Sequence, residues 1–206
     1  MERVAVVDYG LCNVDSVVRA LHHCGAAPFL AHDATDLKAA DRIVLPGVGA
    51  FAAAMERLEG AGLVGSLADT VLDEGVPFLG ICLGMQLLAR WSDEGGRRNG
   101  LGWFDAEVER IVPKPDQRVP HIGWNQVDRA TDSPLFAGIP DHTDFYFVHS
   151  FHVRCADPAD VLATTPFAGG VAACIARPPI YGVQFHPEKS QQHGLQLLRN
   201  FLTVAG

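Results

Sequence analysis

An apolar strand pattern runs into a helical pattern through a turn in which two glycines flank a cysteine. The segment reads Phe78-Leu79-Gly80-Ile81-Cys82-Leu83-Gly84-Met85-Gln86. Glycine on both sides lets neighbouring backbone approach closely, which predicts a sharp strand-to-helix turn that lifts the Cys82 side chain clear of a sheet. Unpaired N–H groups at the helix start favour thiolate over thiol, so the turn predicts a nucleophile. The alternative is a buried structural cysteine, a common state in an apolar run.

A second apolar run ends in His186-Pro187-Glu188. Nucleophile and base of a cysteine hydrolase meet in the fold, so their distance along the chain is no objection. We expect His186 to take the thiol proton. Glu188, held by the rigid Pro187, is expected to hydrogen-bond the other imidazole nitrogen and fix its tautomer. A capping or core histidine beside a helix N-terminal acid is the alternative.

A third apolar run opens into the glycine turn Pro46-Gly47-Val48-Gly49. Attack of a thiolate on a carbonyl creates an oxyanion that needs preorganised N–H donors about 3 Å away. We expect the main-chain amides of Val48, Gly49 and Leu83 to supply them. A phosphate-binding loop is a weaker alternative, because no Lys-Ser/Thr pair follows the glycines.

The first half of the chain alternates apolar runs with amphipathic stretches. We expect strands at 3–8, 28–32, 42–45 and 76–81, and helices at 13–24 with Asn13 as its cap, at 35–40, at 50–74 with a break near 60–62, and at 84–90. Such alternation predicts a parallel α/β sheet.

From about residue 105 the apolar runs become short and are separated by glycine, proline and aspartate. We expect strands at 106–112, 123–128, 145–148, 151–155, 161–165, 171–176 and 180–185, and a closing helix at 195–201. The predicted fold class is α/β: an open, mostly parallel sheet flanked by helices, with an adjoining antiparallel section in the second half. No linker or repeat divides the chain, so 1–206 is expected to be a single domain.

The three segments that contain Val48, Cys82 and His186 each follow an expected apolar strand. Ligands of open α/β sheets bind at the carboxyl ends of the strands, so Val48, Cys82 and His186 are expected to converge although they lie far apart in the sequence.

Composition narrows the functional classes. The chain has 16 Lys and Arg against 24 Asp and Glu, a formal charge of −8, and no basic run, which argues against a nucleic-acid partner. No long apolar stretch or leader pattern is present, which predicts a cytoplasmic protein without a membrane anchor. The five cysteines show no paired spacing, and the nine histidines are scattered, so no metal and no cofactor are expected.

Together these motifs resemble the class I (triad) glutamine amidotransferases. Further stretches are similar to the glutaminase subunits of imidazole glycerol phosphate synthase: Asp8-Tyr9-Gly10, Pro120-His121-Ile122-Gly123-Trp124-Asn125, Tyr146-Phe147-Val148-His149-Ser150-Phe151 and Leu198-Arg199-Asn200-Phe201. The resemblance spans nearly the whole chain in order. Cys12 is a departure, because the family usually has glycine there, which leaves the backbone of this loop in question.

The resemblance implies hydrolysis of L-glutamine to glutamate and ammonia by Cys82, His186 and Glu188. By the family's pattern, Gln86, Ser150 and Phe151 would bind the substrate; an exposed helix residue is the alternative for Gln86. The resemblance also implies a heterodimer with a (β/α)₈-barrel cyclase that takes up the ammonia and makes imidazole glycerol phosphate and aminoimidazole carboxamide ribotide in histidine biosynthesis, a lyase step.

Residues of the partner-facing rim are expected to be Asn13, Trp124, Tyr146 and Lys189, because aromatic residues anchor interfaces and Lys189 directly follows Glu188. A core position for both aromatic residues and a solvated charge at Lys189 are the alternatives.

Other functions stay open on the sequence alone. A paralogous glutaminase would keep the same triad and feed a different synthase. A non-catalytic regulatory protein would not need Cys82, His186 and Glu188, and a cysteine hydrolase of non-amide substrates would not need the glutamine-recognition segments.

Overall fold

The computed structural model describes residues 1–204. Its first half contains β1 (Arg3–Val7), α1 (Val14–His23), β2 (Ala27–Ala31), α2 (Ala34–Lys38), β3 (Arg42–Gly47), α3 (Phe51–Gly60), α4 (Leu63–Ala68), η1 (Asp69–Asp73), β4 (Phe78–Cys82) and α5 (Leu83–Gln86). Its second half contains β5 (Trp91–Ser92), β6 (Arg98–Asn99), β7 (Ala106–Arg110), β8 (His121–Arg129), η2 (Pro134–Phe136), β9 (Thr143–His149), β10 (Phe151–Cys155), η3 (Pro158–Asp160), β11 (Val161–Thr165), η4 (Phe167–Gly169), β12 (Val171–Arg177), β13 (Ile180–Val183), η5 (Pro187–Lys189) and α6 (Gln191–Phe201).

The central sheet changes from parallel to antiparallel pairing along its width. Its order is β2-β1-β3-β4-β13-β12-β11-β8-β9, with parallel pairs from β2 to β13 and antiparallel pairs from β13 to β9. The predicted α/β class, with a parallel sheet and an antiparallel section, is confirmed. The antiparallel strands extend the parallel sheet itself.

A second, smaller sheet has the order β10-β7-β5-β6. Its short strands β5 and β6 were not predicted, and the helix expected at 84–90 is wrong beyond Gln86. The reason is that the chain after α5 bonds to a distant segment: the Leu101 N–H donates to the Leu87 carbonyl, and the Arg90 N–H donates to the Ala106 carbonyl. These long-range pairs replace the bonds that would continue a helix.

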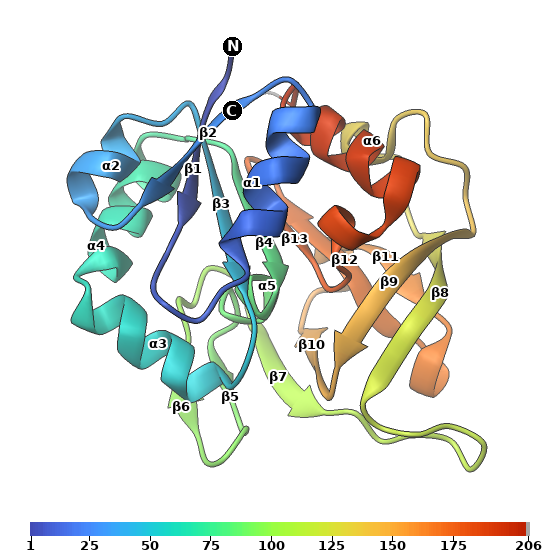
Figure 1. Ribbon diagram of the computed structural model, residues 1–206. Helices are drawn as coiled ribbons and strands as arrows, with labels where there is room; N and C mark the ends of the chain where they lie inside the picture. Colours follow the sequence, from blue (N-terminus) through green and yellow to red (C-terminus); the bar gives the residue numbers. More distant parts are fainter. Residues whose placement is uncertain (205–206) are drawn as a thin grey trace.

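Helices cover both faces of the parallel half, which is why its strands β1, β3, β4 and β13 are mostly apolar and buried. Alternate residues of β1 point to opposite sides: Val4 and Val6 join a core with α1 and α6, whereas Ala5 and Val7 join a core with α2, α3 and α4. Figure 1 shows these two groups of helices on either side of the sheet, with the antiparallel strands β8 and β9 extending beyond α6.

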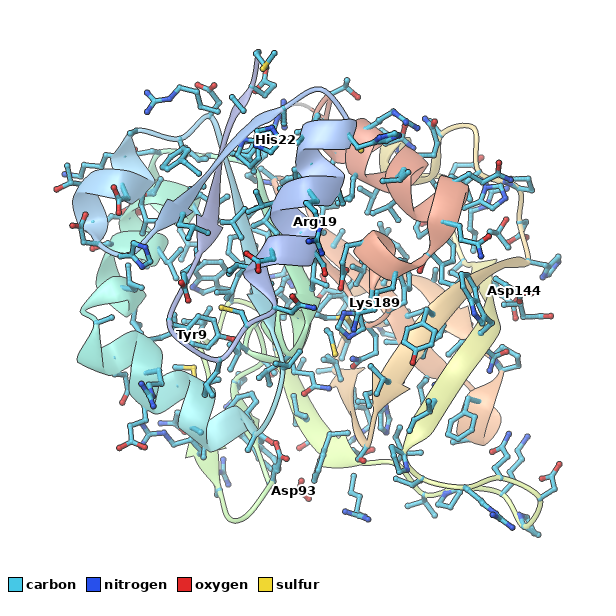
Figure 2. The ribbon with its side chains drawn as sticks, viewed as in Figure 1. Tyr9, Arg19, His22, Asp93, Asp144 and Lys189 are labelled. Atoms are coloured by element: carbon cyan, nitrogen blue, oxygen red, sulfur yellow. The ribbon has the colours of Figure 1, made fainter. Side chains whose placement is uncertain are left out.

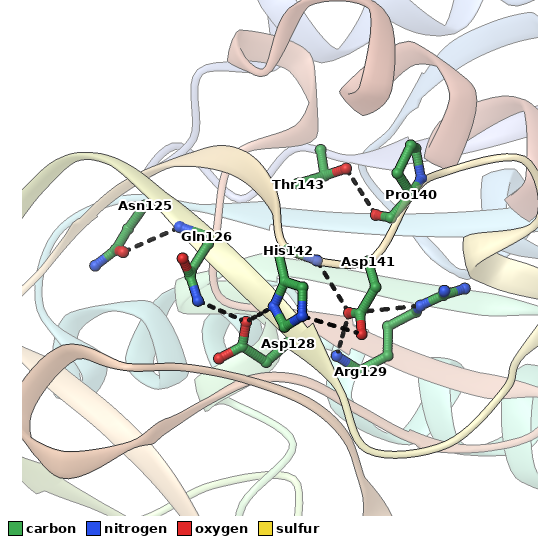
Figure 3. A network of polar contacts seen from close by, with 8 residues as sticks. All are labelled: Asn125, Gln126, Asp128, Arg129, Pro140, Asp141, His142 and Thr143. Atoms are coloured by element: carbon green, nitrogen blue, oxygen red, sulfur yellow. Dashed lines mark hydrogen bonds and ion pairs between the residues drawn. The ribbon is translucent and has the colours of Figure 1, made fainter.

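The hairpin of β8 and β9 forms the far edge of the central sheet, and polar contacts fix its connection (Figure 3). The Asp128 carboxylate accepts from Gln126 at 2.9 Å and contacts Nδ1 of His142 at 2.7 Å. This hydrogen bond to Asp128 raises the pKa of His142. Asp141 accepts from the Arg129 backbone N–H at 2.9 Å. The register that results places His121 opposite His149 at the end of the hairpin near the site described below.

Candidate active site

Cys82 ends β4 in a strained backbone conformation, φ 55° and ψ −106°. A positive φ is costly for a residue with a side chain, and such strain is concentrated at functional turns. The flanking glycines are needed for close packing. A Cβ on Gly84 would overlap the Leu45 carbonyl oxygen, and one on Gly80 would lie 2.6 Å from the Gly84 carbonyl oxygen. The predicted sharp turn is confirmed, and α5 starts directly after the cysteine.

Strand register brings the three predicted segments to one edge of the sheet. Gly47 at the end of β3 pairs with Cys82, and Val183 at the end of β13 pairs with Ile81, so β4 lies between the strands that lead to Val48 and to His186. The expected convergence is therefore observed.

His186 and Glu188 form a buried pair. Nδ1 of His186 lies 2.8 Å from Oε1 of Glu188, and the two side chains are 4% and 2% exposed. Burial alone would lower the pKa of His186, but the nearby Cys82 sulfur and the Glu188 carboxylate outweigh it and raise the pKa to about 9. Within residues 1–204, Nε2 of His186 forms no hydrogen bond of normal geometry, which leaves it available on the Cys82 side.

A cavity of about 350 Å³ opens above these residues. It is lined by most of the residues predicted for the site: Val48, Gly49, Cys82, Leu83, Gln86, Ser150, Phe151 and His186. Glu188 is outside this lining and contacts Nδ1 of the His186 imidazole. The volume is in the range of small-molecule sites.

Gln86 is buried, so the alternative of an exposed helix residue is wrong. Its Nε2 donates to the Phe151 carbonyl and to Oε1 of Gln184, each at 3.0 Å. Both hydrogens of that amide are therefore used within the protein, and its Oε1 is the atom that remains as an acceptor.

In the glycine turn after β3, the Val48 amide is already hydrogen-bonded within the protein. The Val48 N–H donates to the Leu11 carbonyl at 3.0 Å, so it does not point freely into the cavity. Gly49 has φ +99°, a conformation open to glycine and strained for other residues. Val48 itself is 41% exposed, so its peptide is not locked by packing of its side chain.

Four residues of the cavity wall had no role predicted from the sequence: Glu94, Pro120, Val148 and His149. Glu94 is held by the Phe51 N–H at 2.8 Å and lies in a segment without a recognisable motif. His149 stood within a quoted motif, and its neighbour across the hairpin, His121, stood in another. Nδ1 of His121 lies 2.9 Å from Nε2 of His149, a contact that strand pairing alone reveals.

These two histidines are neutral at ordinary pH. Burial lowers the pKa of His121 to about 4 and that of His149 to about 3. Nδ1 of His149 donates to the Phe151 carbonyl at 2.7 Å, so its Nε2 must accept from His121. Both tautomers are fixed by this chain of contacts.

The residues predicted for the partner-facing rim lie at the surface. Asn13 and Lys189 are exposed, Trp124 is 48% exposed and Tyr146 is partly exposed, so core positions for the aromatic residues are wrong. Trp124 packs edge-on against Tyr146, and Lys189 Nζ lies 5.9 Å from the Tyr146 ring centroid. Figure 2 shows Lys189 between α1 and β9, and its segment η5 contacts both of these elements as well as α6.

Asn13 occupies the N-cap position of α1 as predicted, but its side chain makes no capping hydrogen bond. The neighbouring Cys12 does not require a glycine backbone, because Gly10 carries the positive φ of this loop at +83°. The Cys12 thiol contacts the Asp8 carboxylate at 3.5 Å, and burial raises its pKa to about 11.

Within the described part of the chain, no group of three or more His, Cys, Asp or Glu side chains is arranged to hold a metal ion. None of the helices in residues 1–204 has the length and apolar character needed to cross a membrane.

The strained cysteine turn and the buried His–Glu pair meet at one cavity on an α/β sheet, and comparison with known families agrees with this arrangement. The family model "Glutamine amidotransferase class-I" matches residues 5–205, and the chain belongs to that family of enzymes. Solved structures share the fold: a glutamine amidotransferase from Thermotoga maritima has a TM-score of 0.68 at 19% identity, with 98% of this chain and 96% of that one covered.

Curated relatives narrow the family further. The imidazole glycerol phosphate synthase subunit HisH of Rhodospirillum rubrum is 48% identical, with 98% of this chain and 99% of the relative covered. The protein HisH 2 of Pseudomonas aeruginosa is 41% identical, with 98% and 99% covered. The chain thus belongs to the HisH family, the glutamine amidotransferase subunits of imidazole glycerol phosphate synthase.

Proposed function

We propose that this protein hydrolyses the side-chain amide of L-glutamine through Cys82, His186 and Glu188. The observation that carries the proposal is the cavity lined by Cys82 and His186, with Glu188 bonded to the far side of the imidazole. A raised pKa at His186 supports it, because an imidazolium beside the sulfur favours the thiolate.

In the first half-reaction the Cys82 thiolate attacks the amide carbon. The tetrahedral intermediate collapses as His186 Nε2–H protonates the departing nitrogen, which leaves as ammonia, and a γ-glutamyl thioester remains. In the second half-reaction His186 Nε2 accepts a proton from water, the resulting hydroxide attacks the thioester, and glutamate and the thiolate are released. Glu188 holds Nδ1–H throughout, so that Nε2 exchanges the proton in both steps.

Two amides of the glycine turn, those of Val48 and Gly49, together with the Leu83 N–H, are proposed as oxyanion donors. Leu83 follows the nucleophile at the first position of α5. The Val48 N–H would have to leave the Leu11 carbonyl before it could serve. Activation would therefore require a turn of that peptide.

Glutamine would be recognised by polar groups of the cavity wall. The acceptor Oε1 of Gln86 suits an N–H of the substrate, and the Glu94 carboxylate in the cavity wall suits the substrate's α-ammonium group. Ser150 and Phe151 are proposed to contact the substrate's α-groups through the segment that links β9 and β10. A buried site whose polar groups need hydrogen-bond partners from the substrate discriminates strongly against analogues that lack those polar atoms.

We further propose that ammonia passes to a (β/α)₈-barrel cyclase in a heterodimer, where imidazole glycerol phosphate and aminoimidazole carboxamide ribotide form in histidine biosynthesis. The relatives' names support this step, and the exposed rim of Asn13, Trp124, Tyr146 and Lys189 offers a surface for the partner. Residues 1–206 are proposed to act as one domain. All five cysteines are free thiols, which suits the proposed reducing cytoplasm.

The test is glutamate release by the purified chain, alone and mixed with a (β/α)₈-barrel cyclase that holds its nucleotide ligand. Cys82→Ala is the blank. A rise on mixing that disappears in Cys82→Ala would support both the chemistry and the partner. Release that no barrel cyclase increases would favour a paralogous glutaminase for another synthase. Wild-type turnover in Cys82→Ala would overturn the proposed triad.

A further inference from the structure

The sulfur of Cys82 has a neighbour outside the triad. Gln184 is fully buried, and its Nε2 donates to Sγ of Cys82 at 3.6 Å. It lies just after β13, and its backbone N–H donates to the Ala173 carbonyl at 2.9 Å, so the side chain starts from a fixed point in the sheet. Within residues 1–204, this is the hydrogen bond of normal geometry in which the Cys82 sulfur is the acceptor.

The orientation of the Gln184 amide is determined by its surroundings. The Phe151 carbonyl can only accept, so Gln86 must direct its Nε2 toward it. The second hydrogen of that Nε2 reaches Gln184, which must therefore present Oε1 there. Nε2 of Gln184 is then left facing the sulfur as a donor. A reversed amide would place Nε2 of Gln184 against Nε2 of Gln86, two donors, and would leave a thiolate without a donor.

A donor in this position distinguishes thiolate from thiol. The thiol can direct its hydrogen toward the Val148 carbonyl, which is a long contact of 3.9 Å, whereas the thiolate can only accept. A neutral N–H donor in a buried site strengthens when its acceptor becomes charged, and it leaves the imidazole of His186 free to move protons.

We propose that Gln184 stabilises the Cys82 thiolate and holds the sulfur toward the cavity, with Gln86 fixing the orientation of the donating amide. This inference rests on the proposed role of Cys82 as nucleophile. Gln86 would then have two roles. Its amide oxygen would bind substrate, and its amide nitrogen would fix the orientation of the Gln184 amide that donates to the sulfur.

The test is the pH dependence of Cys82 alkylation by iodoacetamide in the full chain, followed by mass spectrometry of the peptide that contains Cys82. Gln184→Met keeps the length of the side chain and removes the donor. We expect the midpoint of its pH–rate profile to rise by about one pH unit or more. Gln184→Glu keeps the shape and the acceptor for Gln86 but places a carboxylate beside the sulfur, so its midpoint should rise further.

Gln192→Met, at an exposed position of α6, is the matched control and should keep the wild-type profile. If Gln184→Met does not fold, the nearly isosteric Gln184→Glu supplies the measurement. A wild-type midpoint in the folded Gln184 variants would overturn the proposal. Alkylation does not require glutamine turnover. An altered profile in a chain that shows no glutaminase activity even with the cyclase and its nucleotide ligand present would therefore refute the proposed function and leave the hydrogen bond from Gln184 to the sulfur standing.

Discussion

Oε1 of Glu188 lies 2.8 Å from Nδ1 of His186, and both side chains are almost completely buried. A pair shielded from water in this way holds one tautomer of the imidazole and strongly favours its protonated form. Oε2 of Glu188 has no partner within residues 1–204, so the carboxylate is committed to the histidine through one oxygen.

Glu188→Gln should lower glutaminase activity by about 10²- to 10⁴-fold, because the amide can direct a donor toward Nδ1 and select the wrong tautomer. The pKa of His186 is raised on folding, so its contribution to stability is complete below about pH 6.5 and is lost as pH rises through about 9. Denaturant titrations should show the wild-type chain losing up to about 3 kcal/mol over this window. An equally steep loss in Glu188→Gln would contradict the assignment.

Cys82→Gly should abolish activity without the usual cost of a glycine. The strain at φ 55° is relieved in glycine, which offsets its greater freedom in the unfolded chain. We expect the free energy of unfolding of Cys82→Gly to lie no more than about 0.5 kcal/mol below that of Cys82→Ala, or above it. Ala53→Gly in the first turn of α3 is the control and should cost up to about 1 kcal/mol. Urea unfolding of the four proteins, wild type included, decides the point.

Gly84→Ala and Gly65→Ala form a matched pair with opposite expected signs. A methyl group on Gly84 would overlap the Leu45 carbonyl, so the turn must shift, and a loss of more than about 3 kcal/mol is expected. Gly65 lies in α4 with open space around it, where alanine should stabilise by up to about 1 kcal/mol. Thermal unfolding measures both, and a neutral Gly84→Ala would show that the turn is less tightly packed than described.

The buried histidine pair should make the protein sensitive to acid. Folding lowers the pKa of His121 and of His149, so the folded state binds fewer protons than the unfolded one below about pH 6.5. Stability is then complete above that pH and is lost as pH falls toward 4. His121→Phe, which fits between the stacked rings of Phe147 and Phe167, should flatten this slope even if it is less stable at pH 7. Acid titration of unfolding followed by circular dichroism gives the two slopes.

Trp124→Ala should weaken the proposed partner complex by about 2 kcal/mol, roughly 30-fold in Kd, because a half-exposed tryptophan packed on Tyr146 has the character of an interface anchor. Leu72→Ala is the control, since Leu72 is 50% exposed and lies on η1, away from this rim. Calorimetric titration with the cyclase distinguishes the two, and equal affinities for both variants would remove Trp124 from the interface.

Much of the fold was predictable because a run of apolar residues that forms a buried strand is visible in the local sequence. The strands around Val44, Leu79 and Val183 are buried on both faces, and their apolar runs gave their positions to within about two residues. The break near Gly60 was readable for a similar reason, because Gly62 adopts the left-handed conformation between α3 and α4.

Features that depend on pairing between distant segments were not readable. Strands β5 and β6 have two residues each, too short for any period, and residues 87–90 leave the helix because of partners more than ten residues away. The same limit applied to the site. Cys82 and His186 carry chemical signatures, but Gln184 and His149 gained their meaning from side chains that only the folded sheet brings beside them.

The hydrogen bond from the Val48 N–H to the Leu11 carbonyl joins the turn that is proposed to bind the oxyanion to a loop that ends at Asn13, on the rim proposed for the partner. In a cell that makes more of this protein than of the proposed cyclase partner, surplus copies would keep that bond and spare the glutamine pool. Unequal expression of the two proteins would then leave nitrogen metabolism undisturbed, and supply of ammonia would follow the number of assembled pairs.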